Sequence, residues 1–551
     1  MGSQVSQQEL QQGLIPIIGS SHDPSLASLL NQGAGGIRSS SIGLTSIIGG
    51  DSASLHNNPM EESLDFQNQK LLMKGIASTA TRELAKLLLY NEPFWVLSSS
   101  QEGKLTLHPE IYEIFFPKNK HFIGPNVRAE SSKDSVTVNI SGMQLVEMFL
   151  DPVKWANLFP SILAKAETIK VFDSGLSSNQ NGALLLMCGE MHVLSPLVQP
   201  RKFHFLRYCE HVKAGLWMIT DVSVDPSRQH NPFSRSWKHP SGCMIQEIPD
   251  GSCRVFWVEH VEVDEMQTHQ LFRDLVDTKI IYGAERWTKE LQRMCERFTC
   301  FSEDKTQDHD HRGVICSNEG KRSVMNLACR MVKMFCESLS MTGYEMNFPS
   351  SNMENTSGIK FSVRKNTEMG QPSGTVVVAT TTLWLPHHYQ KVFEFLTDIS
   401  KRSQWDVLAA EHSVHEIGNI LVGANPGNYI SLIQPLMSNT ENNMVILQEC
   451  SMDPMRSYIV FAPADIPAMN AAIGGGDTSM IQILPSGFVI STDGQTNIEN
   501  SRGSLLTVAF QILVNSLTAD ELPVLDVGNA GDVLTLLDSI VENIHSALSS
   551  Y

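Results

Sequence analysis

Residues 183–224 read ALLLMCGEMHVLSPLVQPRKFHFLRYCEHVKAGLWMITDVSV and carry the main evidence for the fold. Three runs rich in apolar and aromatic residues, 183–193, 203–209 and 216–224, are separated by short polar or turn-rich segments such as Ser195-Pro196. Runs of this length and composition predict β-strands. Because their connections are short, we expect an antiparallel meander rather than β-α-β units.

The same pattern extends outward from this stretch. Residues 254–263 form a further strand candidate, and Val136, Val138 and Ile140 alternate with polar residues as in a half-buried strand. A long helix is predicted to close the region, because apolar residues recur every three or four positions, at Ile280, Ala284, Trp287, Leu291, Met294 and Phe298.

This combination predicts an α+β domain with a curved antiparallel sheet around a long C-terminal helix. An antiparallel sheet with one buried face needs a cover, and one helix, about 10–12 Å wide, is narrower than five or more strands. The space that remains between the sheet and the helix is filled either by large side chains or by a ligand.

The plan is repeated in the second half, which predicts a second α+β domain. Helical spacing at Leu145–Trp155 has a counterpart at Val392–Trp405, and further strand candidates follow the second copy. A last striped helix runs through Val533, Leu537, Ile540, Ile544 and Leu548. We therefore expect four parts: a disordered polar leader (1–66), a first domain (67–301), a linker (302–318) and a second domain (319–551).

Composition and charge exclude several classes of protein. The chain has 551 residues, 42% of them apolar, and a formal net charge of -18 without any dense Lys/Arg run, so direct nucleic-acid binding is not expected. No apolar run approaches the ~18 residues of a membrane span. The 10 cysteines form no CxxC pair, which disfavours a zinc finger and fits reduced thiols.

Charged residues on apolar rows of the predicted strands are the candidate binding groups. Glu190 and Glu259 each share a phase with apolar neighbours, and Arg207 shares that of Phe203 and Phe205. One interpretation is an internal ion pair between Arg207 and Glu190 or Glu259, or a strand end that reaches water. The other is the polar end of an apolar pocket. The predicted lining consists of Glu190, Arg207, Trp217, Trp257, Glu259 and Trp287.

Catalytic and metal-binding motifs are missing from the sequence, so we expect no enzyme. Neither a GxSxG elbow nor a GxxxxGK[ST] loop occurs. His309-Asp310-His311 lacks a third ligand and is expected to be solvated, so no metal and no cofactor are predicted. Met1-Gly2-Ser3-Gln4-Val5-Ser6 fits the short N-myristoylation pattern, which matches often by chance.

Several longer phrases resemble a known family. Residues 195–208, SPLVQPRKFHFLRY, are similar to the central motif of START lipid-transfer domains. The match to plant class IV homeodomain–leucine zipper transcription factors is closer and covers about residues 69–550. It rests on PFW (93–95), NGAL (181–184), SGCMIQE (241–247), WVEHVEVD (257–264), YGAERW (282–287), RSQWD (402–406), NPGN (425–428), ILQE (446–449) and LPSGF (484–488).

The resemblance implies a START domain of helix-grip fold followed by a START-adjacent domain. It also implies a cavity for a lipid or sterol, dimers with related transcription factors, and a nuclear role in epidermal development, with the cytoplasm as an alternative location. The family's basic homeodomain and zipper are not matched, because the segment before Lys70 is polar and has Arg38 as its only lysine or arginine. DNA binding is therefore not carried over from the family.

Three functions stay open at this stage. The first is a lipid-sensing or sterol-sensing regulatory module without its own DNA reader. The second is a soluble intracellular lipid-transfer protein, and the third is a dimerisation scaffold with a filled cavity. The sequence names neither the ligand nor the oligomeric state.

Overall fold

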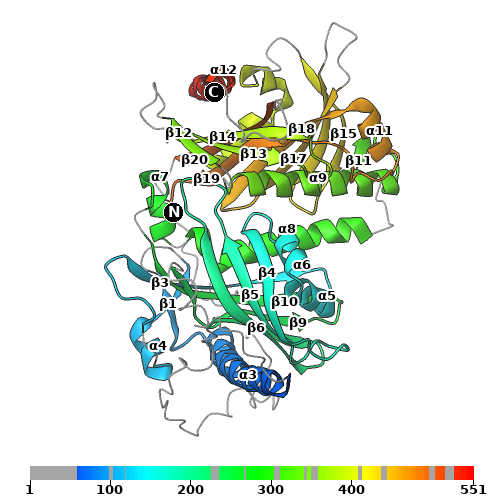
Figure 1. Cartoon of the computed structure of the whole chain (residues 1–551). Helices are drawn as coiled ribbons and strands as arrows, with labels where there is room; N and C mark the ends of the chain where they lie inside the picture. The colour runs from blue at the N-terminus through cyan, green and yellow to red at the C-terminus, as the bar shows by residue number, and fades with distance from the viewer. Residues whose placement is uncertain are drawn as a thin grey trace, which may run out of the picture.

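The computed structural model contains two units that follow each other along the chain, each a curved antiparallel sheet with helices on both faces (Figure 1). It describes residues 59–98, 103–117, 120–224, 235–265, 268–278, 280–302, 311–340, 344–348, 358–406, 413–435, 444–494, 503–514 and 527–551. Most of the predicted leader, and residues 303–310 of the predicted linker with His309-Asp310 among them, lie outside the described residues. Helix α3 begins at Pro59, earlier than the apolar spacing predicts.

Within the described residues, the first unit is built from one long sheet, a small two-stranded sheet, six α-helices and one short 3-10 helix. Its helices are α3 (Pro59–Leu89), α4 (Pro109–Phe115), α5 (Gly142–Leu150), α6 (Pro152–Leu158), α7 (Gln270–Asp277), η2 (Ile280–Tyr282) and α8 (Ala284–Ser302). Its strands are β1 (Trp95–Leu97), β2 (Leu105–Leu107), β3 (Val127–Val138), β4 (Leu163–Asp173), β5 (Leu184–Met191), β6 (Arg201–Lys213), β7 (Leu216–Ser223), β8 (Ser236–Lys238), β9 (Ser241–Glu247) and β10 (Cys253–Asp264).

The strand order of the first sheet is β3-β10-β9-β7-β6-β5-β4, and β8 pairs with β10. All pairs are antiparallel, and the first strand β3 closes onto the last strand β10. The predicted meander is thus confirmed, and the predicted strand at 183–193 is β5. Strands β4 and β9 were not predicted. The exposed row of β4 mixes Lys165 and Glu167 with Ile169 and Val171, so the strand shows no clear alternation of apolar and polar residues.

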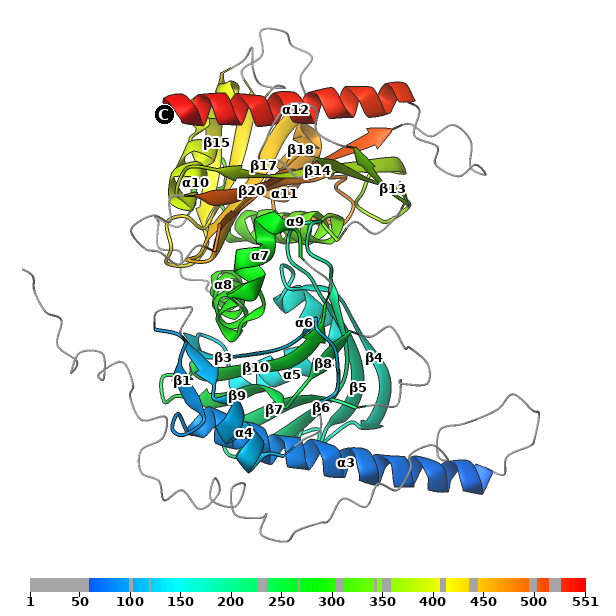
Figure 2. The same ribbon diagram turned by 90° about the vertical axis from the view of Figure 1, so that its left-hand side faces the viewer.

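The two faces of this sheet are covered by different helices (Figure 2). Long helix α3 packs on the outer face, where Met73 and Ala77 contact Leu184 and Leu206. Helix α8 lies on the inner face, where Trp287 and its apolar stripe join the main core with α5 and α6. Because both faces are covered, a strand such as β5 is apolar on both of its rows.

Helix caps fix the position of the short helices on the inner side. Ser141 and Gln144 form a capping box at the start of α5. Asp151 accepts hydrogen bonds of 2.9 Å from the backbone of Val153 and Lys154 and so starts α6. These caps place Trp155, one turn into α6, against the centre of the sheet, where a Cβ on Gly189 would lie 3.3 Å from its ring.

The second unit repeats the plan. Its helices are α9 (Asn318–Ser338), α10 (Tyr389–Thr397), η3 (Ile399–Gln404), α11 (Ile466–Ile473) and α12 (Val527–Ser550). Its strands are β11 (His311–Gly313), β12 (Tyr344–Phe348), β13 (Ile359–Asn366), β14 (Gly374–Leu385), β15 (Val414–Leu421), β16 (Tyr429–Pro435), β17 (Met444–Met452), β18 (Arg456–Asp465), β19 (Ser486–Thr492) and β20 (Ser504–Val514).

The order β14-β20-β19-β18-β17-β16-β15 in the second sheet matches the order of the first sheet strand for strand. Helices α10 and η3 follow β14 as α5 and α6 follow β3, and Trp405 packs against Phe461 and Phe488. Strands β13 and β12 extend this sheet beyond β14, and β11 is added at β15. The predicted repeat is therefore visible in the topology, although the side chains differ.

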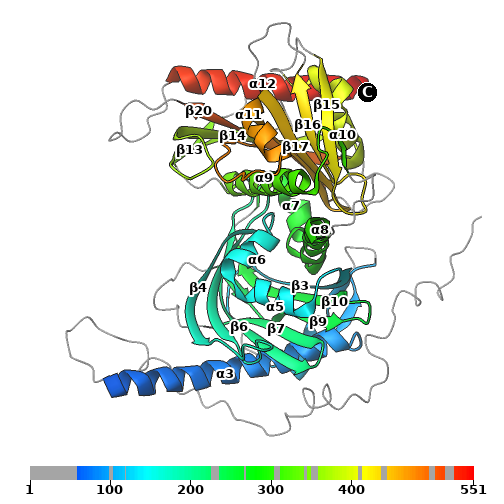
Figure 3. The same cartoon turned by 90° about the vertical axis from the view of Figure 1, so that its right-hand side faces the viewer.

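Helices α8 and α9 lie between the two sheets and bring the units together (Figure 3). The guanidinium of Arg297 on α8 donates a 2.8 Å hydrogen bond to the carbonyl of Met325 on α9. On the far side of the second sheet, α12 packs its stripe of Leu537, Ile540 and Ile544 into a separate core.

A pair of glycine substitutions tests this packing. Gly242 has φ +127°, and a Cβ there would lie 2.1 Å from the carbonyl oxygen of Ile219. We expect Gly242→Ala to lower the free energy of unfolding by at least about 2 kcal/mol. Gly75 in exposed α3 has open space around it, so Gly75→Ala should raise stability by about 0.5–1 kcal/mol. Chemical denaturation measures both, and equal effects would contradict the assigned β7–β9 packing.

Candidate functional site

The inner face of the first sheet carries a group of stacked aromatic rings beneath α8. Trp287 stacks on Trp257 at 5.1 Å between ring centroids and on Trp155 at 6.1 Å. Phe159 meets both Trp257 and Trp287 edge-on. Such rings contribute large buried area with defined geometry. They form the apolar part of the candidate site.

Four charged side chains lie among these rings, each at most 5% exposed: Arg207, Asp221, Lys238 and Glu259. Arg207 and Asp221 form a bidentate pair at 2.8 and 2.7 Å. Lys238 lies 3.2 Å from the carboxylate of Glu259 and 3.9 Å from that of Asp221. The four formal charges cancel, and burying such groups is tolerated only when they are paired in this way.

Further contacts fix the orientation of the charged groups. Arg207 donates to the carbonyl of Phe149 at 2.7 Å, and its guanidinium lies 3.9 Å from the centroid of Trp155. Trp257 donates its indole N–H to Glu259 at 2.9 Å. The site is therefore a polar cluster with direct contacts to the aromatic rings.

Trp155 has an unusual feature. Its indole Nε1 is buried and has no hydrogen-bond partner among the described residues. The side chain is only 1% exposed, so the N–H has no access to bulk water. A buried donor left without an acceptor costs about 1–3 kcal/mol, which a bound acceptor would recover.

Cysteine thiols on this face are kept neutral. Burial raises the pKa of the Cys243 thiol, and it raises the pKa of the Cys209 thiol to about 12. Since the thiolate is the reactive form, these side chains act as small apolar groups in the wall.

Most of the residues predicted from the sequence lie on this inner face. Arg207, Trp257, Glu259 and Trp287 form the cluster described above. Trp217 is also inward-facing but lies farther along the sheet, where its indole N–H donates to the carbonyl of Asn179 at 3.1 Å. Whether these residues line a ligand cavity stays a prediction.

The placement of Glu190 on the same face is wrong. Leu185, Met187 and Met191 of β5 belong to the inner core, so Glu190 points to the outer face, where it lies opposite Lys202. The sequence pattern was misleading because the outer row of β5 is covered by α3, and its residues Leu184 and Leu186 are therefore apolar as well.

The predicted partners of Arg207 are also corrected. An ion pair was expected, but its partner is Asp221 rather than Glu190 or Glu259. Asp221 and Lys238 were not identified from the sequence. Asp221 shares the phase of Trp217 and Ile219 on β7, which is the signal that could have identified it.

The opposite face of α8 carries a second set of charged residues, and it meets the second unit. Glu290 accepts from Arg293 at 2.7 Å and from Arg456 of β18 at 2.9 Å. Arg297 pairs with Glu449 of β17. Burial alone would raise the pKa of Glu290, but Arg293 and Arg456 lower it to about 2. We call this set, which α8 shares with β17 and β18, the seam.

Two family models match the chain in succession. The START domain model matches residues 75–297, and the model described as "PDF2-like, C-terminal domain" matches residues 317–550. Homeobox-leucine zipper protein HDG11 of Arabidopsis thaliana is 42% identical over 494 residues, which are 87% of this chain and 67% of that protein.

The chain belongs to the plant class IV homeodomain–leucine zipper family. Another family member, ROC8 of Oryza sativa subsp. japonica, is 36% identical over 560 residues, covering 96% of this chain and 77% of its own length. The first unit is the START domain of this family member, and the second matches the family's C-terminal domain. The predicted family resemblance and α+β fold are confirmed.

Similarity to solved structures is weaker. Human StAR-related lipid transfer protein 5 covers 42% of this family member at 15% identity, with a TM-score of 0.27. This similarity is too low to support a conclusion about function. In the described part of the chain, no helix is long and apolar enough to cross a membrane, and no His, Cys, Asp and Glu side chains gather in a group of three or more that could hold a metal ion.

Unpairing the buried charges tests the cluster. Arg207→Met leaves Asp221 buried without its bidentate partner, and we expect a loss of about 3–5 kcal/mol in the free energy of unfolding. The double variant Arg207→Met/Asp221→Leu should recover most of it. As a control, Lys165→Met breaks an exposed pair with Glu167 and should cost less than about 1 kcal/mol. Urea unfolding of the wild type, Arg207→Met, Asp221→Leu and the double variant measures the coupling, and additive single effects would argue against the pair.

Proposed function

We propose that the START domain binds a lipid or sterol and that this chain is a ligand-responsive regulatory module of its transcription-factor family. One observation carries the proposal: a charge-balanced polar cluster lies among stacked tryptophans beneath α8, next to the unpartnered indole N–H of Trp155. An apolar wall with a few convergent polar groups is the usual composition of a small-molecule site.

The Lys238–Glu259 pair is the one that we assign to the ligand's head group. Its atoms are 3.2 and 3.5 Å apart, whereas the Arg207–Asp221 contacts are 2.7–2.8 Å and bidentate. The looser pair is the easier one to open for a hydroxyl or a phosphate oxygen. Trp155 Nε1 would then donate to the same oxygen-bearing group.

Helix α8 would transmit occupancy to the second domain. Its Trp287 face contacts the proposed binding groups, and its Glu290 and Arg297 face contacts β17 and β18. A ligand that binds one arrangement of α8 more tightly than another shifts the equilibrium toward the arrangement it prefers. The size of the shift is set by the difference between its two affinities. This gives the module a physical route from ligand to regulation.

The family supports the rest of the proposal. Its members are named as homeobox-leucine zipper proteins, so we propose a nuclear, regulatory and non-enzymatic role, with dimers formed with related transcription factors. Domain boundaries at about residues 67–301 and 319–551 belong to the same proposal.

Native mass spectrometry with matched variants tests ligand binding. We expect the full chain purified from plant cells to carry a lipid or sterol at one per protein. Lys238→Met/Glu259→Leu removes a whole ion pair and should reduce occupancy at least tenfold, because the head group loses its polar contacts. Lys165→Met/Glu167→Leu removes a surface pair and should leave occupancy unchanged.

Two outcomes would count against this function. If neither the wild-type chain nor the control carries or takes up any lipid, the interior is a filled core and the scaffold function is favoured. If labelled lipid moves between vesicles at a rate that depends on the protein, the chain is a lipid carrier rather than a sensor.

Calorimetry tests transmission through the seam. Glu449→Gln leaves Arg297 buried without its carboxylate, which costs about 3–5 kcal/mol. We expect the wild-type domains to unfold together and this variant to show two transitions. A bound lipid should raise the midpoint temperature of the START-domain transition only. Glu337→Gln, which breaks a surface pair with Lys333, is the control. If both variants unfold like the wild type, α8 does not couple the domains.

A further inference from the structure

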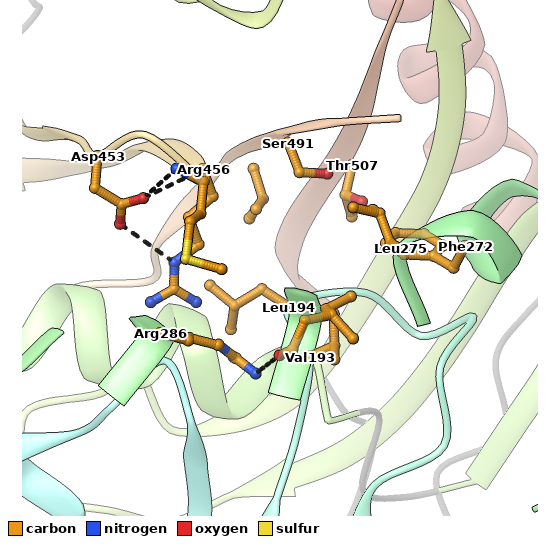
Figure 4. Close-up of a pocket in the computed structure, with 12 residues that line it drawn as sticks. Val193, Leu194, Phe272, Leu275, Arg286, Asp453, Arg456, Ser491 and Thr507 are labelled. Atoms are coloured by element: carbon orange, nitrogen blue, oxygen red, sulfur yellow. Dashed lines mark hydrogen bonds and ion pairs between the residues drawn. The ribbon is translucent and has the colours of Figure 1, made fainter. Parts of the chain in front are cut away.

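A cavity lies at the seam between the START domain and the C-terminal domain. Its volume is about 50 Å³, and it is partly open to solvent. Because one water occupies about 30 Å³ of liquid, the cavity has room for a carboxylate-sized group. It is lined by Val193, Leu194, Phe272, Leu275, Ile281, Arg286, Asp453, Met455, Arg456, Val489, Ser491 and Thr507 (Figure 4).

Positive charge is in excess around this cavity. Its lining holds two arginines, Arg286 and Arg456, and one carboxylate, Asp453. Arg293, Arg297 and Arg456 each pair with a glutamate. Among the described residues, no carboxylate lies within 4.0 Å of Arg286, which is only 5% exposed.

Arg286 is instead held by backbone carbonyls. It donates to Ile281 at 2.8 Å, to His192 at 2.9 Å, and to Ser161. Arg456 also donates to the Ser161 carbonyl, at 3.5 Å, so the two guanidiniums converge. Figure 4 shows them on the same side of the cavity. Of the five N–H donors of Arg286, three are used in this way.

The uncompensated charge has an electrostatic cost. Burial, and then the nearby Arg456 guanidinium, lowers the pKa of Arg286 to about 9. Burial and Arg286 together lower the pKa of His192 to about 3, so this imidazole is neutral. Burial raises the pKa of Asp453, whose carboxylate already accepts from the backbone of Met455 and Arg456. A negative group is therefore favoured beside Arg286.

We propose that the seam cavity binds the carboxylate of a small amphipathic acid, with its head group on Arg286 and Arg456. The apolar part of the acid lies along Phe272, Leu275 and Ile281, which form the opposite wall. Guanidinium groups bind carboxylates through parallel N–H donors, often two at a time. The site is separate from the tryptophan cluster on the other face of α8.

Such an acid would bridge the two domains. Arg286 belongs to α8 of the START domain, and Arg456 belongs to β18 of the C-terminal domain. Binding restores the missing negative charge and adds contacts that exist only in the docked arrangement. Ligand binding of this kind stabilises that arrangement by mass action.

Thermal unfolding and ¹⁹F NMR of the full chain test the site, with acetate, propionate and trifluoroacetate as probes. At tenfold excess over its dissociation constant, acetate should raise the unfolding midpoint by about 3 °C, and the neutral acetamide should not. Propionate, whose extra methylene would lie against the apolar wall, should act at lower concentration than acetate, whereas the neutral propionamide should have no effect. Trifluoroacetate should show line broadening with the wild-type chain.

Three variants locate the effect. Arg286→Met removes the charge, and Ser491→Phe fills the cavity while leaving both arginines in place; each should abolish the acetate shift and the ¹⁹F broadening. Arg273→Met removes an exposed arginine of neighbouring α7 and should retain both. The proposal fails if acetamide equals acetate, if wild-type shows no shift, or if Ser491→Phe responds like the wild type. Propionate binding that survives Ser491→Phe would place the acid outside this cavity and would also overturn the proposal.

Discussion

Helix α8 is buried on both sides, and the arrangement of both domains depends on how its two faces are satisfied. One face places Trp287 between two other tryptophans of the START core. The other places Glu290 and Arg297 in ion pairs with β18 and β17. A helix that is apolar on one face and charged on the other would normally expose its charges. Here the second domain buries these charges, so the relative arrangement of the two domains depends on the geometry of the ion pairs.

Buried ion pairs are weak evidence for stability, since hydrophobic residues of similar volume often do as well or better. Their stronger effect is that any arrangement which separates them leaves a charge without a partner. The quartet around Arg207 and Asp221 applies this constraint inside the START domain, and the seam applies it between domains. Both sets therefore restrict the number of acceptable packings more than they add to the total free energy of folding.

Much of the fold could be predicted because its main elements have clear periodicity. The stripe through Trp287 and Leu291 identified α8, and the apolar runs identified β5 to β7 and β10. Edge strand β4 was missed, since its exposed row mixes polar and apolar residues and its register is interrupted at three points. The site was harder to predict. Glu190 was placed on the wrong face because β5 is covered on both faces, which a single strand's pattern cannot distinguish.

The ionic partners could not be predicted for a different reason. Asp221 meets Arg207 only through the register of β6 on β7, where the two residues are directly opposite. Lys238 reaches Glu259 from β8, a three-residue strand without a recognisable pattern. Pairings of this kind depend on the assembled sheet rather than on any local run of residues.

The charged outer face of α8 has a consequence for synthesis on the ribosome. The START domain cannot close until β10 has paired with β3, and α8 follows β10 in the chain after only α7 and η2. Domains generally fold as units, with the N-terminal one first, so α8 completes its domain before β17 and β18 have been made. During that interval an apolar outer face would invite aggregation, whereas Arg286, Glu290, Arg293 and Arg297 remain hydrated. The nascent START domain can thus remain soluble until the second domain is synthesised and covers this face of α8.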